Sequence, residues 1–138
     1  MATETKCVYC VSTEKSFEDA CVAVRRAAEA HKFGILGAHE FSEILTAKGF
    51  PQSRRIKSID ICAPAPANTL LQAEPLVGLC MPCSILVYTD DGNTRIATIL
   101  PSTVMPQIFP DAFQQCKEVV EKVSAELQAI VDEAARSS

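Results

Sequence analysis

The segment from Pro82 to Leu100 constrains the fold most, because its pattern is typical of a β-hairpin. An apolar run over 82–89 leads into Asp90-Asp91-Gly92-Asn93, whose residue types suit the positive φ angles of a tight turn. A second extended run, Arg95 to Leu100, follows the turn. The sequence therefore predicts two antiparallel strands joined by a short turn in this part of the chain.

Further strands and helices are expected around this hairpin. The predicted strands span 7–12, 33–39 and 55–63, and the predicted helices span 16–31, 42–49, 68–74 and 111–135. The last helix carries apolar residues at a helical spacing from Phe113 to Ala134, with Asp111 as its expected cap, after a loop over 101–110. This order predicts an α+β fold, in which helices pack on one face of an antiparallel sheet and a long helix ends the chain.

The chain's size and composition suit one globular domain, which we expect to span residues 1–138. No stretch approaches the ~20 apolar residues of a membrane helix, and the first six residues lack the apolar segment of a secretory signal. The seven cysteines are odd in number, which favours reduced thiols over a disulfide framework. We therefore expect a cytoplasmic protein that does not bind membranes. Its net charge of −4 also disfavours general binding to nucleic acid.

Two Cys-x-x-Cys pairs, Cys7 with Cys10 and Cys80 with Cys83, suggest metal or redox chemistry at first sight. On a strand, however, residues three apart point to opposite faces, so a zinc site with four cysteines is not expected. A thioredoxin-like dithiol lies at the start of a helix, whereas a strand follows Cys83. We therefore predict no metal site here and interpret Cys7 and Cys10 as small apolar residues of a strand.

A stronger candidate site comes from comparing the ends of two predicted strands. Cys62 ends one strand and Cys83 begins the next, and antiparallel neighbours bring those two ends to the same edge of a sheet. Asp60 lies on the same strand as Cys62, and Pro82 stiffens the connection beside Cys80. These five residues are the predicted ligand-binding site, and the alternative is a tightly packed corner with two inert buried thiols.

The chain resembles the family called domain of unknown function 302 from Cys7 to about Val131. The segments that carry the resemblance are 33–36, 61–64, 71–75 and 78–88, and the matching motif positions are Gly34, Cys62, Gly78, Pro82 and Cys83. The sequence departs from the family pattern at 63–66 and at Cys80. The resemblance implies a fold like that of the TATA-binding protein, in β-α-β4-α order, and a homodimer. It implies no settled reaction, and such a fold alone does not imply DNA binding.

Three functions remain open from the sequence. The first is a small binding module that holds a small molecule or a soft metal near Cys62 and Cys83. The second is a thiol-dependent redox enzyme or sensor, in which Cys83 reacts and Cys62 or Cys80 resolves. The third is a structural homodimer without a ligand. The sequence does not decide whether the chain is an enzyme, and it identifies no cofactor.

Overall fold

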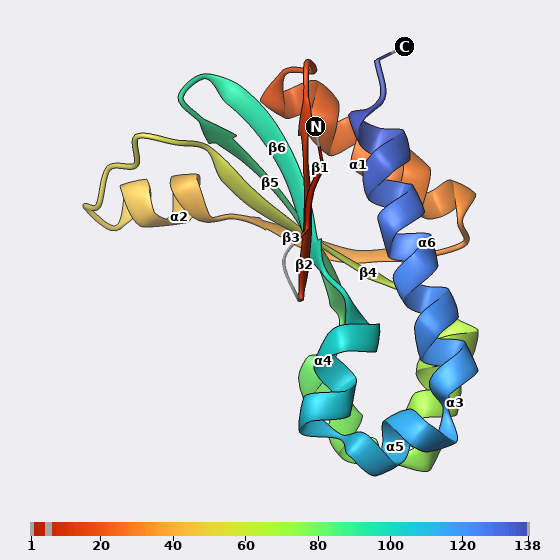
Figure 1. Ribbon diagram of the computed structural model, residues 1–138. Helices are drawn as coiled ribbons and strands as arrows, with labels where there is room; N and C mark the ends of the chain where they lie inside the picture. Colours follow the sequence, from red (N-terminus) through yellow and green to blue (C-terminus); the bar gives the residue numbers. More distant parts are fainter. Residues whose placement is uncertain (1, 5–6, 138) are drawn as a thin grey trace.

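The computed structural model describes residues 2–4 and 7–137, and within them the strands form one six-stranded antiparallel sheet (Figure 1). The order across the sheet is β1-β2-β6-β5-β4-β3. The strands are β1 Ala2–Glu4, β2 Val8–Thr13, β3 Gly34–Glu40, β4 Ile56–Cys62, β5 Cys83–Asp90 and β6 Asn93–Ile99. The helices are α1 Phe17–Ala30, α2 Phe41–Ala47, α3 Pro64–Ala73, the 3₁₀ helix η1 Pro75–Cys80, α4 Pro101–Ile108, α5 Pro110–Gln115 and α6 Lys117–Ala135.

Helices α1 and α6 cover one face of the sheet, and they lie on the same side of it in Figure 1. Alternate strand residues point toward these helices, and four isoleucines among them, Ile59, Ile61, Ile85 and Ile96, have no solvent exposure. This sheet core includes Val24, Ile59, Ile61, Ile85, Val87, Ile96, Leu127 and Ile130. Burial of each such side chain contributes about 1.5–3 kcal/mol before entropy is counted. We call the opposite face, which carries Ser58, Asp60, Ser84, Leu86 and Ala97, the open face.

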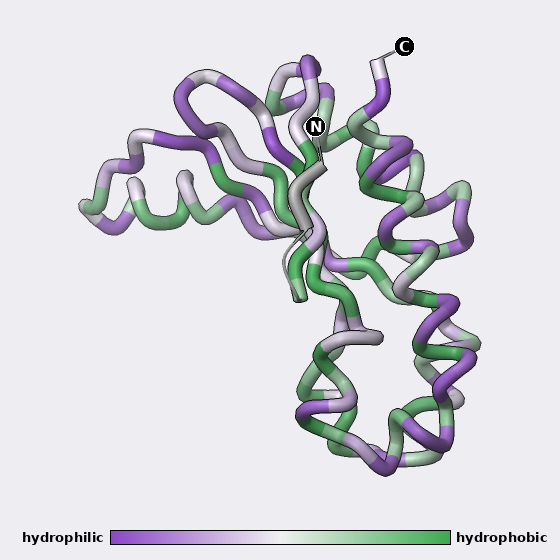
Figure 2. The backbone as a smooth tube through the Cα atoms, viewed as in Figure 1, coloured by the Kyte–Doolittle hydropathy of each residue, from purple (hydrophilic) through white to green (hydrophobic). Residues whose placement is uncertain are grey.

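A second apolar cluster lies at one end of the sheet, where α3, η1, α4, α5 and the start of α6 gather (Figure 1). This end core consists of Leu70, Val77, Met105, Ala112, Phe113, Cys116 and Val120. The α6 tube in Figure 2 alternates between hydrophobic and hydrophilic segments, as expected for a helix that buries one side. Helix α6 therefore joins the two cores, because Val120 belongs to the end core and Val123 to the sheet core.

The predicted α+β fold is confirmed. Apart from β1, which was not predicted, and the shorter helices, the elements follow a β-α-β4-α order. The predicted hairpin turn is also confirmed, because Asp91 and Gly92 have φ angles of 50° and 82°. Ser16 caps α1 as its hydroxyl accepts a hydrogen bond from the Asp19 amide at 3.1 Å.

The prediction of a loop over 101–110 was wrong, since α4 and the start of α5 occupy it. Pro101 and Pro110 begin these helices, where the missing N–H of proline costs nothing. The same effect starts α3 at Pro64 rather than at Asn68. Prolines that were interpreted as marks of loops therefore mark the first turns of helices.

The predicted helix over 111–135 is interrupted at Cys116, whose φ and ψ are −118° and 26°. The segment before Cys116 packs in the end core, and most of α6 packs on the sheet core. The chain therefore changes direction where its apolar partner changes. Asp111 lies in the first turn of α5 rather than at its cap. The helix predicted over 42–49 begins one residue earlier, at Phe41, and the Ser42 hydroxyl accepts a hydrogen bond from the Ile56 amide.

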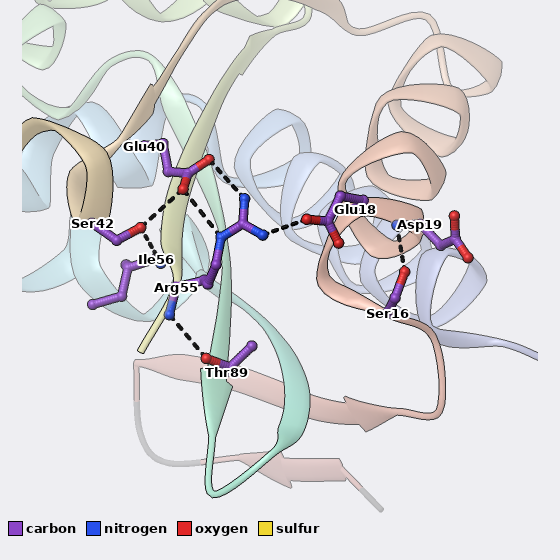
Figure 3. Close-up of polar contacts among 8 residues, drawn as sticks. All are labelled: Ser16, Glu18, Asp19, Glu40, Ser42, Arg55, Ile56 and Thr89. Carbon is purple, nitrogen blue, oxygen red and sulfur yellow. Dashed lines mark hydrogen bonds and ion pairs between the residues drawn. The ribbon is translucent and has the colours of Figure 1, made fainter. Parts of the chain in front are cut away.

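Arg55 ties β3, α1 and the start of β4 together beside α2 (Figure 3). Its guanidinium donates to both carboxylate oxygens of Glu40, at 3.2 and 3.3 Å, and it also pairs with Glu18. The guanidinium carbon lies 4.2 Å from the centre of the Phe17 ring. Hydrogen bonding from Arg55 lowers the pKa of Glu18 below its ordinary value. The Arg55 backbone amide bonds the Thr89 hydroxyl at 2.9 Å, which fixes the start of β4 against β5.

Candidate functional site

Cys62 and Cys83 lie where β4 ends and β5 begins, and β4 pairs with β5 in an antiparallel manner. In this pairing Ile61 is directly opposite Cys83. Both cysteines line a small hollow of about 40 Å³, together with Pro82 and residues of α3. This volume has room for water but not for an organic ligand, because small-molecule pockets usually occupy about 300–1,000 Å³.

A much larger cavity, of about 460 Å³, lies next to this hollow. One wall comes from the open face and the adjoining strand ends, and it includes Ser58, Ser84, Leu86, Ala97 and Ile99. The other wall comes from the end core, through Leu70, Val77, Met105 and Val120. The inserted helices and the sheet therefore enclose a cavity whose lining side chains are mostly apolar.

Three of the predicted site residues, Cys80, Pro82 and Cys83, line the larger cavity, and Cys83 and Pro82 also line the small hollow. The Met81–Pro82 peptide bond is cis. Burial, with a smaller effect from nearby Cys62, raises the pKa of Cys83 to about 11. The seven cysteines all lie in the described part of the chain, and all are free thiols. Cys83 is therefore a neutral thiol at neutral pH.

Asp60 lies on the open face with Ser58 and Ser84, on the other side of the sheet from Cys83 and Ile61, but it lines neither cavity. Its carboxylate accepts hydrogen bonds from the Ser84 hydroxyl at 2.8 Å and from the Ser58 hydroxyl at 3.3 Å. The other carboxylate oxygen lies 3.8 Å from Nε2 of His39. Asp60 therefore orients the hydroxyls of two serines that line the larger cavity.

Sequence reasoning missed both serines as site residues. The signal was present, because Ser58 and Asp60 alternate along one face of β4 and an antiparallel partner had to supply a residue opposite Asp60. The end core was also missed, since its members come from five helices, α3, η1, α4, α5 and α6, and from Cys116 between the last two. In residues 2–4 and 7–137, no group of three or more His, Cys, Asp or Glu side chains is arranged to hold a metal ion. No helix among the described residues is long and apolar enough to cross a membrane.

The fold and the cavity define a class of small α+β domain, in which short helices of two connections, one between β4 and β5 and one between β6 and α6, border an apolar cavity against an antiparallel sheet. The family described as "Domain of unknown function DUF302" matches residues 9–134. The chain belongs to this family, which confirms the resemblance predicted from the sequence.

A solved structure agrees with this assignment. The chain is similar to the crystal structure of an uncharacterized conserved DUF302 protein from Bacillus stearothermophilus, with a TM-score of 0.85 and 25% sequence identity. The similarity covers 94% of this chain and 98% of that one. No curated protein matches the chain.

Proposed function

We propose that this chain is a binding module for an apolar small molecule, which occupies the 460 Å³ cavity between the open face and the end core. The cavity carries the proposal, because its volume lies within the range of small-molecule sites and apolar side chains form most of its lining. Met81 and Met105 add adaptable thioether side chains, which accommodate ligands of varied shape.

The protonation of the buried Cys83 thiol favours a ligand-binding function over thiol chemistry. A reactive cysteine needs a thiolate, whereas burial raises the pKa of Cys83 to about 11 and keeps it protonated near neutral pH. A soft metal between Cys62 and Cys83 would also require Cys83 to lose its proton. We therefore favour the small-molecule form of the binding hypothesis over a redox enzyme, a redox sensor or a metal site.

The fluorescent probe N-phenyl-1-naphthylamine tests the proposal, because it is apolar and emits more strongly in an apolar site. We expect saturable binding of one probe per chain. The Val104→Trp variant places an indole at the cavity wall on α4 and should weaken binding by roughly tenfold or more, since a blocked site loses its apolar contacts.

The matched control is Ile108→Trp, which adds the same indole to an exposed position of α4 that does not line the cavity. This variant should bind the probe as the wild type does. Circular dichroism and urea unfolding establish that both variants are folded. Absence of saturable probe binding to the wild-type chain, or equal weakening in the two variants, would refute the proposed site.

A further inference from the structure

Within the described chain, the hydroxyl side chains that line the cavity are Ser58, Ser84 and Thr98, and each donates its proton to another group of the protein. The Ser84 and Ser58 hydroxyls donate to one carboxylate oxygen of Asp60, at 2.8 and 3.3 Å. The Thr98 hydroxyl donates to the Ser84 backbone carbonyl at 2.9 Å. The hydroxyl side chains of the wall are therefore oriented by hydrogen bonds to the protein.

This arrangement has a direct consequence for what the wall offers to a ligand. A hydroxyl has one proton and two lone pairs, so a hydroxyl that has already donated its proton retains only acceptor capacity. The remaining polarisable groups of the wall, the thiols of Cys80 and Cys83 and the methionine thioethers, form only weak hydrogen bonds. The side chains of the wall thus offer a ligand mainly hydrogen-bond acceptors.

Asp60 adds an electrostatic preference to this acceptor surface. Its side chain is 20% exposed, and its carboxylate lies one hydrogen bond behind Ser58 and Ser84. Among the described residues, the basic side chain that pairs with this carboxylate is that of His39, whose Nε2 lies 3.8 Å away and which is more than half exposed, so solvent weakens the pairing. A positive group at the cavity wall beside Ser84 would interact favourably with the carboxylate.

We propose that the ligand is an apolar molecule with an ammonium head group, which donates hydrogen bonds to Ser84 and Ser58 beside Asp60. The apolar part lies against the end core, where Val77, Met105 and Val120 form the facing wall. This inference rests on the proposed function, since it specifies the ligand of the same cavity. An acidic head group is excluded from this position, because a carboxylate would meet acceptors and a second negative charge.

Displacement of bound N-phenyl-1-naphthylamine by decylamine, decanol and decanoate tests the inference, with each compound kept below its micelle concentration at pH 7. The three compounds share one alkyl chain and differ in their head groups. Decylamine should displace the probe at a concentration roughly tenfold or more below that of decanoate. Its ammonium group donates charge-assisted hydrogen bonds to the serines, whereas a carboxylate has no proton to donate and carries the same charge as Asp60. Decanol should fall between them.

The Asp60→Asn variant should bring the affinities for decylamine and decanoate close to each other, since the amide lacks the charge and can itself donate to the serines. The matched control is Asp132→Asn on α6, where the Tyr9 hydroxyl donates to the carboxylate at 2.7 Å outside the cavity. This control should keep the wild-type preference. Ser84→Ala leaves Asp60 in place and should weaken decylamine binding by roughly two- to tenfold.

The outcomes separate the inference from the proposed function. Probe binding with decanoate as effective as decylamine overturns the ammonium head group and leaves an apolar binding site. An unchanged preference in Asp60→Asn overturns the role of Asp60. Failure of the wild-type chain to bind the probe and all three alkyl compounds overturns the proposed function itself.

Discussion

Replacement of Arg55 by alanine should destabilise the fold by about 2–3 kcal/mol. The guanidinium donates two hydrogen bonds to Glu40, a side chain that is only 12% exposed, and hydrogen bonds to charged groups contribute about 1.5–3 kcal/mol. Its position over the Phe17 ring adds about 0.5–1 kcal/mol. Arg55 is itself 43% exposed, so solvent screening reduces the sum, and the exposed pair with Glu18 is left out of it.

Urea unfolding, followed by circular dichroism, measures this loss as a lower midpoint at an unchanged slope. Arg55→Lys should lose an intermediate amount, because a lysine keeps the charge but cannot donate two parallel hydrogen bonds to one carboxylate. The control is Arg54→Ala, whose neighbouring guanidinium forms an exposed pair with Asp90 at 3.3 Å. It should cost less than about 0.5 kcal/mol. Equal losses in Arg54→Ala and Arg55→Ala would refute the reasoning from burial and bidentate geometry.

Two further predictions follow from buried polar groups. The pKa of Cys83 is raised from 9.0 to about 11, so the unfolded chain loses this proton first and stability should fall as the pH rises from 9 to 11. Urea unfolding across this range should show that the free energy of unfolding falls by roughly 2–3 kcal/mol less in Cys83→Ala than in the wild type. An equal fall in the two proteins would contradict the prediction. Ser124→Ala should cost about 1–3 kcal/mol, because the Ser124 hydroxyl accepts the Ser102 amide at 2.8 Å where α4 begins. Hydrogen exchange should then speed up at the Ser102 amide, and unchanged protection there would contradict the expectation.

The sheet could be predicted from the sequence because local patterns specify it. Alternation along 56–62 and the turn at Gly92 depend on residues that are neighbours in the chain. The α4 helix could not be predicted in this way, since prolines at both ends of 101–110 are equally compatible with a loop and with first turns of helices. The break at Cys116 depends on packing partners from distant segments, which a single helical pattern does not reveal.

The candidate site was predictable in part for the same reason. Pro82 and Cys83 stand at a strand entrance, where their residue types are unusual, and both line the larger cavity. The cavity itself is the space left between elements far apart in sequence, so no local pattern encodes it. Ser84 was not predicted as a site residue, because an isolated serine is common in strands. The homodimer stays a prediction that sedimentation equilibrium measures.

The enclosure of the cavity has a consequence for how such a protein diversifies. Its floor is the paired sheet, whereas its roof comes from two connections, one between β4 and β5 and one between β6 and α6. Connections tolerate substitution and changes of length better than paired strands do. The roof can therefore be reshaped for new occupants while the strand ladder stays intact, so one scaffold can support a range of chemical specificities.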